Sequence, residues 1–389
     1  MIASANVRAV MTTTLTLSVV ACAPHYTDAQ LQAPRSPTPA SIAAPIRVET
    51  FASGLEHPWA LAFLPDGRLV VTERPGRLRI VDREGHVSAP LAGTPQVFAR
   101  GQGGLLDVAV DPRFSENRLL YLSYAEPGDG NDAGTAVARG RLGDGRLEDV
   151  QVIYRQQPKV AGGNHFGSRL VFRGDGTLFV TQGERFNYRQ QAQDLSDDLG
   201  KIIRINADGS VPKDNPFVGR REARPEIWSY GHRNVQAATL DPATGRLWTV
   251  EHGARGGDEL NHPEAGKNYG WPVITYGVDY SGARIGEGTA KPGMEQPVYF
   301  WDPVIAPSGM AFYTGDAFRD WKGSVFVGSM TPGALVRLVL EDGKVAREER
   351  YLGDLHERIR DVQQGPDGLL YLVTDNAEGR VLRLSPTTR

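Results

Sequence analysis

The most regular feature of the chain is a short unit in which two apolar, strand-length segments flank a turn rich in Asp, Pro and Gly. In the first copy, residues 60–64 and 69–72 flank the turn Pro65-Asp66-Gly67. This arrangement is typical of two β-strands joined by a hairpin turn. The unit returns five more times, at residues 106–122, 170–180, 238–250, 309–327 and 361–373.

Six copies of such a unit predict an all-β protein, since helical periodicity is weak throughout the chain. A single hairpin cannot bury both of its faces, whereas radial repetition of small sheets can. The pattern therefore favours a six-bladed β-propeller over a pair of β-sandwiches. We expect residues 46–51 to pair with 380–384 and close the ring, and the loops of all blades to build an active site at one mouth of the central channel.

One loop carries the clearest candidate chemistry. His165 lies between Gly162-Gly163-Asn164 and Phe166-Gly167, just before the apolar run that starts at Leu170. Glycines on both sides allow a tight turn and leave room above the imidazole. A neutral imidazole near pH 7 can accept a proton from an alcohol, so His165 is a candidate general base.

Further polar clusters precede other copies of the unit at the same phase, and we expect them to face the same end of the channel. Gln102 lies in a Gly-rich segment before the second copy, and Arg233 and Asn234 precede the fourth. Arg358 and Arg360 precede the sixth, at alternate positions that put both guanidiniums on one side of an extended strand. Three arginines at one mouth predict a pocket for a ligand with several carboxylates.

Composition and the N-terminus restrict the setting. The chain has 389 residues and a formal net charge of -3, which gives no reason to expect nucleic acid as a partner. Residues 1–22 are typical of an export signal, with Arg8 before an apolar stretch too short to span a bilayer comfortably. Ala21-Cys22 resembles a bacterial lipoprotein cleavage site; an ordinary signal peptide is the alternative.

We therefore expect a periplasmic protein that is tethered to the membrane through a lipid at Cys22. Residues 23–45, which are rich in proline and small polar residues, predict a flexible tether, followed by the propeller at residues 46–386. Cys22 is the single cysteine of the chain, so the mature domain has no disulfide, thiolate metal site or cysteine nucleophile.

At this level of detail the chain resembles the soluble pyrroloquinoline quinone (PQQ) dependent sugar dehydrogenases, and most closely their aldose sugar dehydrogenase branch. The resemblance covers residues 46–386. It rests on Gly-Gln-Gly-Gly-Leu-Leu from residue 101, His-Phe-Gly-Ser-Arg-Leu from 165, Gly-His-Arg-Asn from 231, Asn-Tyr-Gly-Trp-Pro from 268 and Arg-Ile-Arg-Asp from 358. The family fold, a six-bladed propeller, agrees with the repeat count.

The resemblance implies oxidation of an aldose at its anomeric carbon to a lactone, with His165 as the general base and PQQ as the hydride acceptor. The positions that match cofactor contacts of the family are Gln102, Arg233, Asn234, Tyr280, Ser329, Met330, Thr331, Arg358, Ile359 and Arg360. The family commonly has a lysine at the position of Thr331. A threonine brings no positive charge there, which puts cofactor affinity and reduction potential in question.

The resemblance also implies two calcium sites. Gly253 and Ala254 match residues whose backbone carbonyls bind a Ca²⁺ that contacts the cofactor, and Glu259 with the carbonyl of Tyr269 matches a structural site. Hard oxygen ligands of this kind suit calcium. Without the resemblance, Asp258-Glu259 would be interpreted as an acidic surface turn.

Three alternatives remain open from the sequence. The first is a calcium-dependent hydrolase of the lactonase type, which needs carboxylates around a channel metal where this chain has arginines. The second is a binding propeller without turnover, and the third a PQQ enzyme that acts on sorbosone-like aldehydes. The sugar would be selected by loops such as residues 126–138 and 185–200; the electron acceptor, and whether the protein is a monomer or homodimer, are not predicted.

Overall fold

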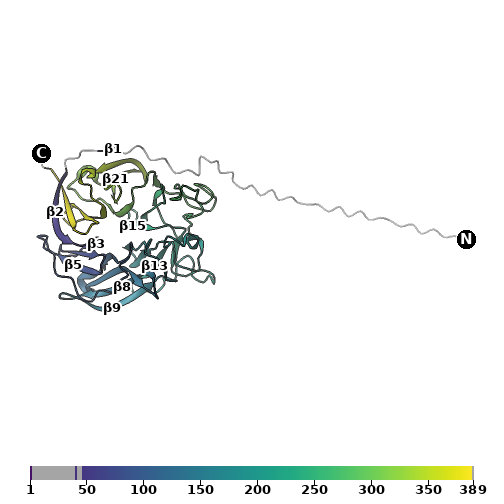
Figure 1. Ribbon diagram of the computed structural model, residues 1–389, viewed down its shortest axis with the longest axis horizontal. Coiled ribbons are helices and arrows are strands. Elements are labelled where there is room, and N and C mark those ends of the chain that lie inside the picture. Colours follow the sequence, from purple (N-terminus) through teal and green to yellow (C-terminus); the bar gives the residue numbers. More distant parts are fainter. Residues whose placement is uncertain (2–39, 42–45, 388–389) are drawn as a thin grey trace.

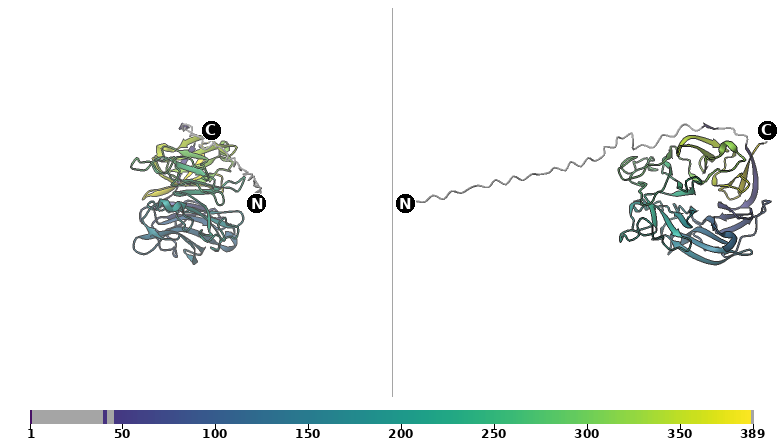
Figure 2. Two further views of the ribbon diagram at one scale, coloured as in Figure 1. Left: turned by 90° about the vertical axis from the view of Figure 1, so that its right-hand side faces the viewer. Right: turned by 180° about the vertical axis from the view of Figure 1, so that it is seen from behind.

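The computed structural model describes residues 1, 40–41 and 46–387. Cys22, the export signal beyond Met1 and nearly all of the tether lie outside these residues. The described part is a six-bladed β-propeller, in which six small sheets are arranged in a ring around a central channel (Figure 1). Figure 2 shows the ring from the side and from behind.

Each sheet begins with an inner strand and its hairpin partner, and these six pairs coincide with the six predicted units. The inner strands contact one another in the order of the chain, and the last also contacts the first, so the ring is closed. The inner strands are β3 (Pro58–Phe63), β6 (Leu105–Val110), β11 (Leu170–Phe172), β15 (Val235–Leu240), β19 (Pro307–Phe312) and β23 (Ile359–Gln364). Their partners are β4 (Leu69–Glu73), β7 (Leu119–Pro127), β12 (Thr177–Thr181), β16 (Leu247–Glu251), β20 (Val325–Ser329) and β24 (Leu370–Thr374).

The outer strands complete the blades. The third strands are β5 (Arg77–Val81), β8 (Asp132–Leu142), β13 (Lys201–Asn206), β17 (Asp258–Asn261), β21 (Ala334–Glu341) and β25 (Gly379–Pro386). At the edges lie β1 (Ala40–Ser41), β2 (Ile46–Leu55), β9 (Leu147–Arg155), β10 (Val160–Ala161), β14 (Ile227–Tyr230), β18 (Tyr299–Trp301) and β22 (Lys344–Tyr351). In the described part of the chain, four short helices lie in connections: α1 (Phe114–Asn117), η2 (Arg189–Gln193), η3 (Arg319–Trp321) and η4 (Gly353–Leu355).

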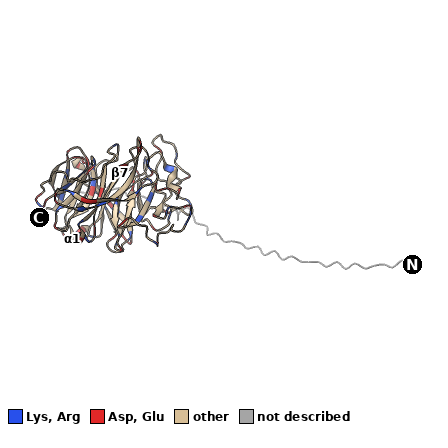
Figure 3. Cartoon of the chain, turned by 90° about the horizontal axis from the view of Figure 1, so that it is seen from below, with Lys and Arg blue, Asp and Glu red and all other residues tan. Residues whose placement is uncertain are grey.

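The ring closes through its two ends, as predicted. The N-terminal strand β2 pairs antiparallel with the C-terminal strand β25, with Ile46 opposite Pro386 and Thr50 opposite Leu382. Apolar side chains of the first and sixth blades form one buried cluster across this seam. Figure 3 shows basic and acidic residues interspersed along the ring, consistent with the small net charge.

A buried arginine joins the inner strands at the centre of the channel. Arg169, which directly precedes β11, contacts Asp107 of the second blade and Asp361 of the sixth, each at 3.1 Å. Its guanidinium also lies 4.1 Å from the ring of Trp59 in the first blade. Burial raises the pKa of Asp107 to about 6, so this carboxylate depends on the arginine for its charge. The central contact fixes how the loops at the mouth are placed relative to one another.

Candidate functional site

A cavity of about 510 Å³ opens at the channel mouth, and several predicted site residues line it. The lining includes Gln102, Met330, Arg358 and Arg360, which come from loops and strands of the second, fifth and sixth blades. Arg74 from the first blade and His252 from the fourth, which the sequence did not single out, line it as well. The propeller thus brings together residues that are more than two hundred positions apart in the chain.

The arginines make this cavity basic. Arg360 donates to Asp375 at 2.5 Å and Arg358 lies 3.6 Å from the same carboxylate. The neighbouring guanidiniums hold the pKa of Asp375 well below its usual range, against the opposing effect of burial. The Nε atoms of Arg74 and Arg360 are buried without a hydrogen-bond partner among the described residues. Two unsatisfied donors in a cationic cavity fit an anionic ligand such as the PQQ carboxylates.

His165 lies beside this cavity in a strained, fixed conformation. Its φ of 52° is left-handed, a conformation that non-glycine residues adopt mainly in turns and at functional sites. Its backbone N–H donates to Gln102 Oε1 at 2.8 Å, so Gln102 also holds the His165 loop. The side chain is 4% exposed. Burial, with Arg233 and Arg185 nearby, lowers the pKa of His165 well below its usual value, which keeps the imidazole neutral.

Glu184 was missed by the sequence analysis. It follows β12, and its Oε1 lies 2.9 Å from His165 Nδ1. Burial raises the pKa of Glu184 to about 7, while Arg233 opposes this shift. When ionised, Glu184 accepts a hydrogen bond from Nδ1–H, which leaves the Nε2 lone pair of His165 free. Nε2 has no hydrogen-bond partner within residues 46–387.

Arg233 and Asn234 are consecutive residues just before β15, and Asn234 contacts the His165 loop. Arg233 donates to the carbonyl oxygens of His252, at 3.1 Å, and of Gly253, and its Nη2 lies 3.3 Å from the hydroxyl of Tyr280. Asn234 Oδ1 accepts the Gly167 N–H at 3.1 Å, but its buried Nδ2 has no partner among the described residues. That free donor fits a carbonyl oxygen of a bound quinone.

Three predicted contacts lie elsewhere. Ser329 is buried and donates to the carbonyl of Ile305 at 2.8 Å, and Thr331 is exposed and lines none of the cavities described here. The side chain of Ile359 packs in the core of the fifth and sixth blades, because it points away from its neighbours Arg358 and Arg360 along the strand. Met330 connects this segment to the cavity, and its carbonyl accepts from Arg358 at 3.2 Å.

Three of the four residues predicted to bind calcium line a second, much smaller cavity, whereas Ala254 lines a different cavity, next to Arg233. The small cavity measures about 10 Å³, about the size needed for one water or ion, and Gly253, Glu259 and Tyr269 line it together with Glu251. Burial and the charge of Glu251 raise the pKa of Glu259 to about 8. Asn261 Nδ2 donates to both carboxylates, while its buried Oδ1 has no partner among the described residues.

This donor set fits a hard cation at the Glu259 site. Two carboxylates that repel each other in a buried cavity, with an unpaired amide oxygen beside them, are stabilised by a divalent ion. The Gly253 carbonyl differs, because it already accepts a hydrogen bond from Arg233. A calcium ion there would share this oxygen with a guanidinium. Ala254 lies in the same turn, bridged to Gly256.

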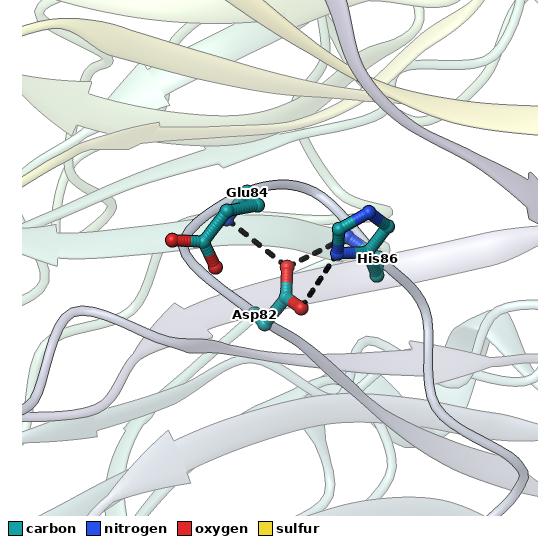
Figure 4. A group of neighbouring side chains, drawn as sticks. All are labelled: Asp82, Glu84 and His86. Atoms are coloured by element: carbon teal, nitrogen blue, oxygen red, sulfur yellow. Dashed lines mark hydrogen bonds and ion pairs between the residues drawn. The ribbon is translucent and has the colours of Figure 1, made fainter.

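An exposed group of metal-ligating side chains lies outside these cavities. Asp82, Glu84 and His86 follow β5 (Figure 4). Asp82 Oδ1 accepts the backbone N–H groups of Glu84 and His86, and its Oδ2 lies 2.8 Å from His86 Nδ1. These bonds stabilise a turn.

A further cavity of about 380 Å³ lies next to His165 on the side of Arg233. Glu184, Phe186, Arg233 and Tyr280 line it. Tyr280, predicted as a cofactor contact, therefore lines this cavity and contacts Arg233 there. Among the described residues, no helix is both long and apolar enough to cross a bilayer.

The fold and the site define a class: a six-bladed propeller whose channel mouth combines a neutral, carboxylate-bound histidine with a basic cavity. The family model for "Glucose / Sorbosone dehydrogenase" matches residues 55–383, and the chain belongs to this family. It is 48% identical over 348 residues to aldose sugar dehydrogenase YliI of Escherichia coli, covering 88% of this chain and 94% of that protein.

Two solved structures are similar over their whole length. The apo-form of the soluble aldose sugar dehydrogenase from E. coli has a TM-score of 0.86 at 47% identity, covering 88% of this chain and 99% of that one. The PQQ-bound form of aldose sugar dehydrogenase from Streptomyces coelicolor has a TM-score of 0.73 at 28% identity, covering 90% and 99%.

Proposed function

We propose that this protein is a PQQ-dependent dehydrogenase that oxidises aldose sugars at the anomeric carbon to lactones, with His165 as the general base. One observation carries the proposal: a neutral imidazole bonded to Glu184 through Nδ1, with Nε2 unpartnered, beside a cavity lined by arginines. The family and its sugar dehydrogenase members support the choice of substrate class.

The histidine and glutamate work as a unit in this account. Ionised Glu184 accepts a hydrogen bond from Nδ1–H, which orients the ring and raises the basicity of Nε2. Nε2 then accepts the proton of the anomeric hydroxyl as its C–O bond becomes a carbonyl, and the hydride lost from that carbon would pass to the quinone. Gln102 and the left-handed backbone at His165 hold the ring in place, which lowers the entropy cost of reaching a reactive geometry.

The cofactor would be held by residues with free or positive donors. Arg358, Arg360 and Arg74 suit its carboxylates, and Arg233 with Asn234 suits its quinone end. When bound, PQQ would supply the hydride acceptor, and Gly253 and Ala254 would hold a calcium ion that could polarise a quinone carbonyl. A second calcium at Glu259 and Tyr269 would stabilise the fourth blade.

We also propose that the domain is held at the periplasmic face of a bacterial membrane by a lipid on Cys22. The support is the sequence of residues 1–22 and the proline-rich segment after them. Cys22→Ser is expected to move the protein from the membrane fraction to the soluble periplasmic fraction. A wild-type protein already found in the soluble fraction would contradict the lipid anchor.

Reconstitution tests the proposed activity. Purified apoprotein is mixed with PQQ and Ca²⁺, and dye reduction is measured with a panel of aldoses. We expect reduction only when PQQ and an aldose are both present. Lactone hydrolysis without PQQ would identify a hydrolase instead, and cofactor binding without turnover would identify a binding protein.

A further inference from the structure

Two aromatic side chains are unusually exposed at the channel mouth. Phe186 is 41% exposed and Tyr280 58% exposed, although large apolar rings are normally buried. Their ring centroids lie 6.3 Å apart at an interplanar angle of 28°. Phe186 follows β12 of the third blade, while Tyr280 lies in the long connection between β17 and β18 of the fourth. The pair therefore joins two blades above the site.

The same two loops are linked by polar contacts. Arg189 Nη1 lies 3.3 Å from Asp279 Oδ2, one residue before Tyr280. Asn187, Arg189 and Asp279 all line the 380 Å³ cavity with the two rings. The cavity thus combines an apolar wall with charged and amide groups that can bond hydroxyls. This combination is typical of a small-molecule site in which polar groups fix the orientation of the ligand.

Phe186 also lies close to the proposed base. Its ring centroid lies 5.2 Å from that of His165, in an edge-to-face arrangement. His165 is only 4% exposed, and the ring of Phe186 is part of what covers it.

The backbone holds Phe186 in that position. Arg185 and Phe186 both have left-handed φ angles, of 64° and 67°. Arg185 is buried and donates to the carbonyls of Ala133, at 2.5 Å, and Asn164, at 2.9 Å. Its guanidinium also packs 3.8 Å from the ring of Phe166. The residue before Phe186 is therefore anchored to the His165 loop, so that Phe186 stays beside the imidazole.

We infer that Phe186 and Tyr280 form the sugar-binding wall of the site, an inference that rests on the proposed function. The apolar C–H face of an aldose ring packs against the two aromatic rings, and Asn187, Arg189 and Asp279 bond its hydroxyls. Tyr280 has two roles in this arrangement: its hydroxyl contacts Arg233 on the cofactor side, and its ring contacts Phe186 on the sugar side.

Substitutions at the two rings test the inference. Phe186→Leu and Tyr280→Leu are expected to raise the KM for aldose about tenfold each, because each removes an aromatic contact. For Phe186→Leu, the Kd for PQQ, titrated by absorbance, should stay within about twofold of the wild-type value. Phe186→Tyr keeps the ring and should retain most of the affinity. Val218→Ala removes an exposed apolar side chain that lines none of the described cavities and serves as the control.

A binding measurement gives a readout that does not depend on turnover. The probe is 1,5-anhydro-D-glucitol, which lacks the anomeric hydroxyl and cannot be oxidised to a lactone. Saturation-transfer NMR should show contact between its ring protons and wild-type protein loaded with PQQ and Ca²⁺, and weaker contact with Phe186→Leu.

The outcomes separate the two claims. If wild-type protein binds the probe but shows no PQQ-dependent turnover, the proposed function is contradicted. The inference that Phe186 and Tyr280 bind the sugar is then still supported. An unchanged KM with weakened PQQ binding would assign the two rings to the cofactor and overturn the inference. An unchanged KM with unchanged PQQ binding would overturn it as well.

Discussion

Two neighbouring blades contain the same pair of side chains in the same place. In the third blade His165 bonds Glu184, and in the fourth His232 bonds Glu251, and the partners are nineteen positions apart in both. Each histidine precedes the inner strand of its blade, and each glutamate lies at or just after the end of the second strand. The Nδ1–Oε1 distances are 2.9 and 3.0 Å.

The pairs differ in what surrounds them. His232 is fully buried, its Nε2 lies 2.9 Å from the Ser229 hydroxyl, and its ring stacks on Tyr269. Glu251 also accepts the Arg233 N–H and a bond from Asn261. The fourth-blade pair therefore has every polar atom of the imidazole satisfied.

In the third blade the same imidazole nitrogen is left open. His165 Nε2 and Glu184 Oε2 have no hydrogen-bond partner among the residues the structure describes. A buried polar group without a partner costs free energy, and such groups persist at functional sites. The comparison indicates that a histidine–glutamate pair is structural when its second nitrogen is covered and suited to chemistry when that nitrogen is open.

The largest effect is expected at the open pair. His165→Ala should lower kcat by about 10³-fold, because a positioned general base contributes that order of magnitude. PQQ absorbance should show that the variant still binds cofactor, since the arginines of the cavity are untouched. If turnover per bound cofactor in the variant equals that of the wild type, His165 is not the general base.

Substitution in the covered pair, His232 and Glu251, should lower the stability of the protein. His232→Ala removes both bonds of a buried imidazole and leaves Glu251 and Ser229 short of a partner. We expect a loss of about 3 kcal/mol in the free energy of unfolding. Denaturant unfolding measures this loss, and the folded fraction should keep turnover within a few-fold of wild type. A stable variant with a large fall in kcat would contradict the structural assignment.

Glu184→Gln probes the pH dependence of the open pair. Below a pH of about 7, Glu184 is protonated in the wild-type protein and no longer favours the tautomer with a free Nε2. Wild-type kcat/KM should therefore rise as pH increases through about 7 and then level off. The glutamine variant should lose this rise and turn over about 10²-fold more slowly. A pH profile that is the same in both proteins would contradict the role of Glu184.

Calcium removal tests the metal site beside the covered pair. Binding at one hundred times Kd stabilises a protein by about 2.7 kcal/mol, so a chelator should lower the thermal midpoint measurably. Glu259→Gln should remove most of that response, because it removes a carboxylate of the small cavity. Asp82→Asn, in the exposed turn group, is the matched control and should keep it. Loss of the response in Asp82→Asn but not in Glu259→Gln would show that calcium binds in the exposed turn group and not in the small cavity.

The smallest effect is expected at Thr331. The residue is exposed next to Met330, which lines the basic cavity, so a lysine there adds positive charge near a ligand with several carboxylates. Thr331→Lys should tighten PQQ binding by up to about tenfold, which corresponds to roughly 1.4 kcal/mol. Absorbance titration measures the Kd. A weaker complex would show that residue 331 does not face the cofactor.

The sequence predicted the fold well because the fold depends on repeated local signals. The six hairpin units and the pairing of β2 with β25 are confirmed. Arg358 and Arg360 alternate along the strand and both line the basic cavity, and the same alternation turns Ile359 into the core. Period-two strand geometry is sufficient for these conclusions.

The site was harder to predict from the sequence than the fold, because it depends on which side chains of different blades contact one another. Glu184 has no distinctive neighbours in the sequence. Only its nineteen-residue distance from His165, repeated by Glu251 and His232, signals its role. Phe186 was hidden inside a loop whose left-handed backbone a sequence pattern does not reveal. The exposure of Thr331 likewise depends on how the turn after β20 leaves the sheet.

Chemical rescue tests the central claim most directly. In His165→Ala, loaded with PQQ and Ca²⁺, the deleted ring leaves space at the open position, and added imidazole should restore turnover with saturating dependence on its concentration. Imidazole should not raise the turnover of His232→Ala, whose site is closed. Failure to rescue His165→Ala while cofactor remains bound, or equal rescue of both variants, would contradict the distinction between the two pairs.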